Sequence, residues 1–392
     1  MTTTTRLERP ATEAVAAALA VVRANLRHFG PSYPGDTTVG GVYELRPAGA
    51  GQPAGANIGW TTGFCAGLVW LAWELTGDDE FRVAGDGHAA SFTARIDQMA
   101  DVETHDLGFL YSLAAVTPWR LTGCAESRRA AVAAASHLMT RFLEPAGIIQ
   151  AWGDLTDPAE RGRTIIDSLM NLPLLHWASE TTGDRRYAAA ARRHADQLRD
   201  HIIRPDGTTF HTFRWDPVSG RPLRGTTAQG WADDSCWARG QVWGVLGFAI
   251  NYRHTGEPTY LAAARRLADR FLAHLPADGV PTWDLALADD PTALRDSSAA
   301  AIAVCGLDEL ARCLAPGEDG RERYVAARDR LLTSLSTAYA PAVGSRPGTP
   351  LLAHGVYDFP KGVGVDEGSL WGDYFYLEAL RRVTDPAWPG YW

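Results

Sequence analysis

One segment of the sequence places a single carboxylate among large apolar side chains. Asp167 lies in Arg-Thr-Ile-Ile-Asp-Ser-Leu-Met-Asn, residues 163–171. A carboxylate in such surroundings must find partners or change its pKa, and a raised pKa would make it a proton donor near neutral pH. Asn171, four residues later, would share a face with Asp167 if the segment is helical. Helix capping is the alternative role for Asp167, but the apolar neighbours favour a buried functional acid.

A second carboxylate, Asp106, lies in Thr-His-Asp-Leu-Gly-Phe-Leu-Tyr, residues 104–111. It interrupts otherwise apolar helical text, so it could be a functional acid. Asp106 could equally be a helix N-cap, with Gly108 only permitting the turn. The residues alone leave both interpretations open.

A third segment, residues 227–243, combines an amide, a guanidinium and three tryptophans. Arg239 and Trp243 lie four residues apart and share a helix face. A guanidinium beside an aromatic plane suits an anionic sugar, although a surface arginine packed over a core tryptophan gives the same pattern. Gln229 lies near the start of the segment. His211, in a short extended stretch upstream, stands alone, and a lone histidine is more often structural than catalytic.

The composition is that of a water-soluble globular protein. The 392 residues carry a net charge of −9, which argues against a nucleic-acid partner, and no apolar run is long enough for a membrane helix. The five cysteines are scattered without metal or disulfide spacing, so we expect a reducing, cytoplasmic location and neither metal nor cofactor. The 14 tryptophans raise the expectation of a carbohydrate site, because aromatic faces stack on sugar rings.

The elements that must position these residues are helical hairpins. Apolar helical segments end in Thr-Gly at residues 76–77, 122–123, 182–183 and 255–256, and three of these are followed by alanine-rich helical segments. A further unit is expected over residues 307–335. Helical hairpins must stack on neighbours to bury both faces, so either an open solenoid or a closed ring follows. The unequal hairpins and long loops favour the ring, an all-α (α/α)6 barrel. Residues 1–392 would form one catalytic domain, with an N-terminal helix and a Gly/Pro-rich rim segment within about residues 1–57.

Seven blocks, taken together and in order, resemble glycoside hydrolase family 88, the unsaturated glucuronyl hydrolases. The resemblance covers nearly the whole chain from about Trp60. The blocks are Trp-Thr-Thr-Gly-Phe (60–64), His-Asp-Leu-Gly-Phe (105–109), Ile-Asp-Ser-Leu-Met-Asn (166–171), Gln-Gly (229–230), Ser-Cys-Trp-Ala-Arg-Gly-Gln-Val-Trp (235–243), Arg-Asp-Ser-Ser-Ala-Ala-Ala-Ile (295–302) and Leu-Trp-Gly-Asp-Tyr-Phe-Tyr-Leu-Glu-Ala-Leu (370–380). The (α/α)6 barrel of that family agrees with the hairpin repeat.

The resemblance implies a reaction and a set of roles. Asp167 would be the general acid and base, with Asp106 as its carboxylate partner. The substrate-binding residues would be Trp60, His105, His211, Gln229, Trp237, Arg239 and Trp243. The enzyme would hydrate the C4=C5 double bond of an unsaturated uronic acid at the end of an oligosaccharide, with a pH optimum on the acidic side of neutral. We expect a monomer or homodimer.

Family members that accept sulfated substrates tend to carry Ser-x-x-Ser-x-Lys before the Trp-Gly-Asp-Tyr block. The corresponding positions here are Asp358, Lys361 and Val363, so we expect a preference for unsulfated substrates, which Lys361 would partly offset. The alternatives are an unsaturated rhamnogalacturonyl hydrolase on the same barrel, a sugar epimerase, and a non-catalytic helical-repeat interaction protein. Epimerases of this fold rely on histidine pairs and an interaction protein on an exposed groove, and neither matches an aspartate among apolar residues.

Overall fold

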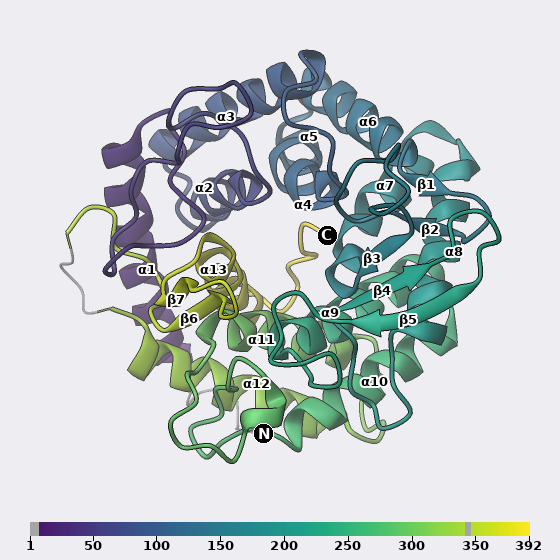
Figure 1. The fold of residues 1–392 in the computed structure, drawn as a ribbon. Helices are drawn as coiled ribbons and strands as arrows, with labels where there is room; N and C mark the ends of the chain where they lie inside the picture. Colours follow the sequence, from purple (N-terminus) through teal and green to yellow (C-terminus); the bar gives the residue numbers. More distant parts are fainter. Residues whose placement is uncertain (1–7, 342–345) are drawn as a thin grey trace.

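The computed structural model describes residues 8–341 and 346–392, and these form a ring of helices in two layers (Figure 1). The inner layer consists of α2 (Thr62–Thr76), α4 (Leu107–Tyr111) continued by η2 (Ser112–Val116) and α5 (Thr117–Thr122), α7 (Leu172–Thr182), α9 (Ala238–Thr255), α11 (Ser297–Arg312) and α13 (Leu370–Thr384). The outer layer consists of α3 (Asp79–Asp97), α6 (Ala125–Met139), α8 (Arg185–His201), α10 (Pro258–Leu272), α12 (Arg321–Ser334), which continues into η5 (Leu335–Tyr339), and α1 (Glu8–Phe29). This ring confirms the predicted (α/α)6 barrel and excludes the open solenoid.

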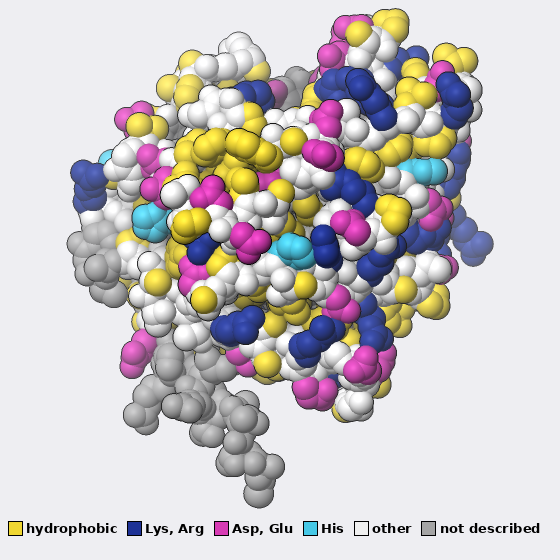
Figure 2. Space-filling view, turned by 60° about the horizontal axis from the view of Figure 1, so that its bottom comes forward, with side chains coloured by type: hydrophobic (Ala, Val, Ile, Leu, Met, Phe, Trp, Pro, Cys, Tyr) yellow, Lys and Arg dark blue, Asp and Glu magenta, His cyan; other side chains and the backbone are white. Residues whose placement is uncertain are grey.

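The two layers follow from the apolar pattern of their helices. The inner helix α9 is buried from Ala238 to Asn251, whereas outer helix α10 buries one stripe: Tyr260, Ala263, Ala264, Leu267, Ala268 and Phe271. A helix that is apolar on all sides belongs in the interior, and one with a single apolar stripe belongs at the surface. In Figure 2, acidic and basic side chains are interspersed over the outer surface, and hydrophobic groups gather around a notch at the upper edge.

The predicted Thr-Gly turns end four of the inner helices. Gly77, Gly123, Gly183 and Gly256 are left-handed C-caps, with φ between 66° and 78°. In each turn the threonine hydroxyl accepts a hydrogen bond from the second residue after it. Asp78, Asp184 and Glu257 then accept backbone N–H groups at the start of α3, α8 and α10. These local bonds make each connection tight and turn the chain back on itself.

The ring is closed by two segments that are far apart in the sequence. Helix α1 packs against α13, and α13 packs against α2. The rim segment, residues 31–57, joins this seam: Thr37 pairs with Ser369, and Tyr43 donates its backbone N–H to the carbonyl of Gly348. Tyr43 also donates its hydroxyl to the buried carboxyl of Asp373. Helix α1 is therefore the outer partner of α13 and not an appendage to the barrel.

Short β-strands lie at one end of the ring. The pairs are β1 (Phe142–Leu143) with β2 (Ile148–Ile149), β3 (Arg163–Ile165) with β4 (Thr212–Trp215), β4 with β5 (Pro222–Thr226), and β6 (Gly355–Asp358) with β7 (Val363–Glu367), all antiparallel. A 3-10 helix, η3 (Ile166–Asn171), connects β3 to α7, and another, η4 (Leu285–Leu287), lies between α10 and α11. Among the described residues, no helix is long and apolar enough to cross a membrane.

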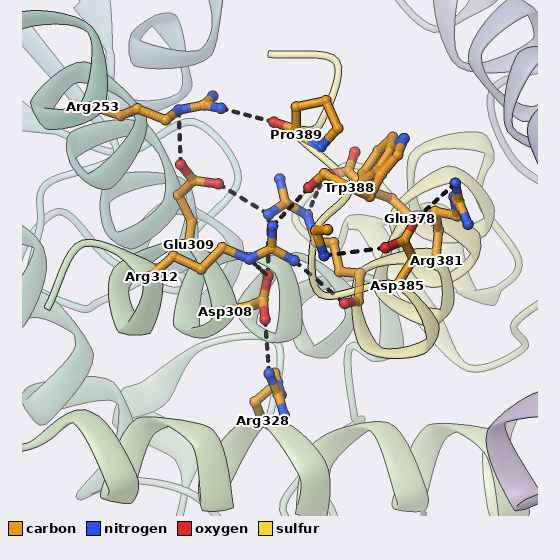
Figure 3. Close-up of polar contacts among 12 residues, drawn as sticks. Arg253, Asp308, Glu309, Arg312, Arg328, Glu378, Arg381, Asp385, Trp388 and Pro389 are labelled. Atoms are coloured by element: carbon orange, nitrogen blue, oxygen red, sulfur yellow. Dashed lines mark hydrogen bonds and ion pairs between the residues drawn. The ribbon is translucent and has the colours of Figure 1, made fainter. Parts of the chain in front are cut away.

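The opposite end of the ring is occupied by the chain segment 385–392. Arg120, Arg253 and Arg312, near the C-terminal ends of inner helices, donate hydrogen bonds to backbone carbonyls of this segment. Arg253 and Arg312 also belong to a network of ion pairs that includes Asp308 and Glu309 (Figure 3). The segment inserts Trp392 into the ring, where its indole stacks on Phe375 and donates to Glu378.

The inner helix α9 can approach η3 closely because it presents a stripe of glycines. An added Cβ at Gly244 would lie 2.6 Å from Leu267 of the outer helix α10. One at Gly240 would lie 3.2 Å from Ile166 of η3, and one at Gly247 would lie 2.5 Å from the Cβ of Leu169 of η3. This contact fixes the position of η3 in the barrel.

We therefore expect Gly247→Ala to destabilise the protein by about 2 kcal/mol, because Leu169 cannot move its Cβ without moving η3. The control is Gly87→Ala on α3, where an added Cβ has nothing within 4 Å. That substitution should stabilise the helix by about 0.5–1 kcal/mol. Denaturant unfolding of both variants measures the difference, and equal stabilities would contradict the close packing.

Candidate active site

A pocket of about 340 Å³ opens at the N-terminal ends of the inner helices. All the predicted site residues line it: Asp106, Asp167, Trp60, His105, His211, Gln229, Trp237, Arg239 and Trp243. The inner helices run in the same direction, so their N-terminal ends converge here. Helix N-termini carry partial positive charge, which favours an anionic ligand.

Asp167 lies at the first turn of η3, directly after strand β3. Its neighbours Ile166, Leu169 and Met170 are fully buried, and its Oδ1 is shielded from solvent without a hydrogen-bond partner. Burial raises the pKa of the Asp167 carboxyl well above its ordinary value, and the negative charge of Asp106 raises it further; Arg239 opposes both. Asp167 is thus a carboxyl group that holds its proton at a pH where most aspartates have lost theirs.

The segment around Asp167 is a 3-10 helix, which changes one expectation. Residues four apart do not share a face at three residues per turn, so Asp167 and Asn171 have different roles. Asn171 is buried, and its Oδ1 accepts the backbone N–H of Phe109 at 2.9 Å. Asn171 is therefore a link between η3 and α4.

Asp106 occupies the N-cap position of α4, but its side chain makes no capping hydrogen bond. Its Oδ2 accepts the hydroxyl of Thr104 at 2.8 Å, and its Oδ1 lies 3.2 Å from Nε2 of His105. These contacts leave the carboxylate at the pocket wall. Burial lowers the pKa of His105, although Asp106 opposes that shift.

Gly108 brings the start of α4 against η3. A Cβ at this position would lie 2.1 Å from the Cα of Asn171, so no other residue fits without moving the backbone. The interpretation of Gly108 as merely permissive is wrong, since the contact of the two elements that carry Asp106 and Asp167 requires it.

His211 presents one ring nitrogen to the pocket in a defined protonation state. Its Nδ1 lies 3.0 Å from the backbone nitrogen of Ala228 and 3.2 Å from that of Gln229, and both N–H groups donate to it. Burial lowers the pKa of His211 to about 3. The ring is therefore neutral with its proton on Nε2, so it can donate a hydrogen bond within the pocket.

Arg239 lines the pocket, but its guanidinium is held by the protein. Nη1 donates to Asp296 at 3.0 Å and to the carbonyl of Val356, and Nη2 donates to the carbonyl of Tyr357 at 2.8 Å. The guanidinium also lies over the ring of Trp237, 4.4 Å from its centroid. These contacts do not support a direct ion pair with a ligand as the main role of Arg239, since they engage both terminal nitrogens. The arginine holds strand β6 and Trp237 in place and supplies positive charge nearby.

The aromatic wall extends beyond the predicted residues. Trp60 stacks on Trp371 with ring centroids 5.2 Å apart and donates its indole N–H to the hydroxyl of Tyr357 at 3.0 Å. Trp243 packs against Phe109. Pocket residues that the sequence reasoning did not place in the site are Trp152, Ile165, Ala228 and Tyr357. Trp152 and Tyr357 lie in loops and strands without a helical pattern, so their only signal was their aromatic character.

Asp358 and Lys361 also line the pocket, at the turn between β6 and β7. The buried Asp358 carboxylate accepts Lys361 Nζ at 2.8 Å and its backbone N–H at 3.3 Å. The pair brings opposite charges to the pocket mouth.

Altogether the pocket joins a proton-holding carboxyl, a second carboxylate and a neutral histidine donor to flat aromatic walls, and this set can transfer a proton to a bound sugar.

Comparison with known proteins places the chain among carbohydrate-active enzymes. The model of Glycosyl Hydrolase Family 88 matches residues 48–313. An unsaturated chondroitin disaccharide hydrolase of Streptococcus pyogenes serotype M1 is 41% identical over 381 residues, which cover 97% of this chain and 92% of the relative. The crystal structure of an unsaturated glucuronyl hydrolase from Streptococcus agalactiae superposes with a TM-score of 0.93 at 38% identity, covering 98% of this chain and 94% of that one. A UGL structure with dGlcA-Glc-Rha-Glc has a TM-score of 0.89 at 40% identity, covering 96% and 97%.

The raised pKa of Asp167 has a consequence for stability. A carboxyl whose pKa is higher in the folded than in the unfolded chain binds more protons when folded, so stability falls as the pH rises above the unfolded value of about 3.9. An amide cannot ionise and avoids this cost.

We therefore expect Asp167→Asn to raise the melting temperature at pH 7 by about 1–3 °C, with a smaller gain at pH 4. Thermal unfolding across this range, with the exposed Asp200→Asn as control, tests the shift. A gain independent of pH would contradict it.

Proposed function

The chain belongs to glycosyl hydrolase family 88, and we propose that it is an unsaturated glucuronyl hydrolase. The substrate is an oligosaccharide of glycosaminoglycan type, or from another polyuronate, whose non-reducing end is a 4,5-unsaturated uronic acid. The observation that carries the proposal is a carboxyl group with a raised pKa, Asp167, beside a second carboxylate in a pocket with aromatic walls.

We assign the central proton transfers to Asp167. The C4=C5 double bond of the substrate is part of a vinyl ether, so protonation at C4 develops positive charge at C5 and the ring oxygen. Asp167 delivers that proton, and water then adds at C5 while the Asp167 carboxylate accepts a proton from it. The resulting hemiketal opens and expels the rest of the saccharide. The separation rule for retaining and inverting glycosidases does not apply, since the anomeric carbon is not attacked.

Asp106 serves the same step through its charge. A nearby carboxylate disfavours a second negative charge and so keeps Asp167 protonated in the free enzyme. Once positive charge develops on the sugar ring, the same carboxylate stabilises it. Its bonds with Thr104 and His105 support this role because they hold the carboxylate in place.

We propose that the neutral histidine and the aromatic residues bind the terminal sugar. The Nε2–H of His211 and the side-chain amide of Gln229 can donate to the sugar carboxylate or to the attacking water. Trp60, Trp237 and Trp243 offer apolar surfaces to the ring. Arg239 adds positive charge near an anionic substrate while holding Trp237.

We further propose one catalytic domain over residues 1–392, a cytoplasmic location, and a monomer or homodimer without a nucleic-acid partner. All the cysteines are free. Cys236 and Cys305 are buried and burial raises their pKa values, which suits unreactive thiols in a reducing compartment.

Asp167→Asn should lower kcat for an unsaturated chondroitin or hyaluronan disaccharide by at least about 10³-fold, because the amide can neither donate nor accept the proton. Loss of the ultraviolet absorbance of the conjugated double bond measures turnover. In the wild type, activity should decline as the pH rises through the pKa of Asp167, and Asp200→Asn should keep the wild-type profile. No turnover by the wild type of any such disaccharide, with turnover of a rhamnose-linked one, would indicate the rhamnogalacturonyl activity instead. A rate that keeps rising above about pH 8 would reject Asp167 as the acid.

The Asp358 carboxylate at the pocket mouth should disfavour a sulfate group on the second sugar, although Lys361 offsets part of the repulsion. We expect unsulfated disaccharides to be preferred, and Asp358→Asn to raise kcat/KM for the sulfated substrate about fivefold relative to the unsulfated one. Asp366→Asn is the matched control, since Asp366 lies on the same hairpin but pairs with the exposed His354. Tighter binding of sulfated substrate by the wild type would refute the preference.

A further inference from the structure

Two exposed aromatic side chains lie on the segments that form one side of the pocket mouth. The Trp231 side chain is 58% exposed and Phe359 is 37% exposed. Trp231 follows the pocket residue Gln229 by two positions, and Phe359 directly follows the pocket residue Asp358. Neither aromatic lines the pocket itself, so the mechanism leaves both unexplained.

A buried tryptophan joins these two side chains into one surface. Trp283 is 2% exposed and stacks on Phe359, with ring centroids 4.5 Å apart and planes at 15°. The ring of Trp231 meets Trp283 edge-on, with centroids 6.3 Å apart. We call Trp231, Trp283 and Phe359 the aromatic platform.

The platform is held in place by a buried carboxylate. Asp284 is fully buried, and its Oδ2 accepts the backbone N–H of Trp231 at 2.9 Å and the hydroxyl of Ser235 at 2.6 Å. Its Oδ1 accepts the backbone N–H groups of Cys236 and Ala286. The backbone at Trp231 is therefore fixed by charge-assisted hydrogen bonds, and the exposed indole has a defined place.

The platform is continuous with the pocket along the chain and in space. Ala238, which begins α9, donates its backbone N–H to the carbonyl of Trp283, and Trp237 pairs with Asp284. The same few residues thus anchor the pocket residue Trp237 and the base of the platform. A saccharide that leaves the pocket on this side meets exposed aromatic surface.

The exposed area suits a sugar ring better than a protein. A stable protein interface buries about 800 Å² on each partner, far more than two side chains can offer. A sugar ring stacks through its apolar C–H face on one or two aromatic side chains. In a related structure the ligand is dGlcA-Glc-Rha-Glc, so saccharides longer than a disaccharide occupy an enzyme of this kind.

We propose that the aromatic platform is a distal subsite that binds a sugar of the leaving saccharide beyond the one joined to the unsaturated uronic acid. This inference rests on the proposed function and extends it to substrate length. The platform makes the enzyme favour unsaturated tetrasaccharides over disaccharides, and Trp231 supplies most of the stacking surface.

The experiment compares kcat/KM for an unsaturated tetrasaccharide and the corresponding disaccharide. Trp231→Ala should lower the ratio of the two values about five- to tenfold, Phe359→Ala should lower it less, and Trp231→Tyr should restore most of it. Val83→Ala is the control, since Val83 is 70% exposed on the outer helix α3. This substitution should leave the ratio of the two kcat/KM values unchanged from the wild type. Calorimetry of tetrasaccharide binding in the Asp167→Asn background should show a Kd that rises by a similar factor when Trp231 is replaced by alanine.

Two outcomes would overturn the subsite. One is a ratio that Trp231→Ala leaves at the wild-type value, and the other is an equal loss for both substrates, which would mean that Trp231 only supports the pocket. A change from dimer to monomer on sedimentation with an unchanged ratio would likewise replace the subsite by a protein interface. Absence of turnover of both substrates by the wild type would instead count against the proposed function.

Discussion

The site depends on a raised pKa at one carboxyl group, Asp167, which lies at the wall of a water-accessible pocket. Water stabilises the ionised form, so the protein must withhold solvent from at least one oxygen and set a negative charge nearby. Burial of Oδ1 without a partner and the neighbouring Asp106 meet both requirements. An unpaired buried oxygen is costly in folding free energy, and the closely packed barrel around it provides the compensation.

Close backbone approach brings the two carboxylates together. Asp106 is carried by the start of α4 and Asp167 by η3, and these elements touch because Gly108 has no side chain and Asn171 bonds to Phe109. The glycines of α9 press on η3 from the other side. The geometry of the acid pair therefore follows from helix packing, and the barrel is more than a support on which loops carry the chemistry.

The sequence predicted what depends on short-range patterns. The Thr-Gly turns, the hairpins and the buried carboxylate all follow from the types and spacing of neighbouring residues, and the family resemblance supplied the residues that meet in the pocket. Sequence patterns could not predict contacts between segments that are far apart in the chain. Tyr357 reaches the pocket because β6 is fastened to Arg239, more than a hundred residues earlier in the chain. The 3-10 form of η3 was also missed, since a period of three differs little from a helical one over six residues.

The seam between α1 and α13 has a consequence for how the protein is made. Helix α1 is synthesised before the other described helices but finds its partner only after α13 has been made, so the ring stays open until then. Until then the apolar faces of α1 and α2 lack the helix that covers them in the closed ring. The last residues described, 385–392, fill the interior at the end opposite the pocket. A nascent chain that stalls before β6 carries both aspartates yet lacks Tyr357, Asp358 and Lys361, so the wall of the pocket is completed only late in the synthesis of the described residues.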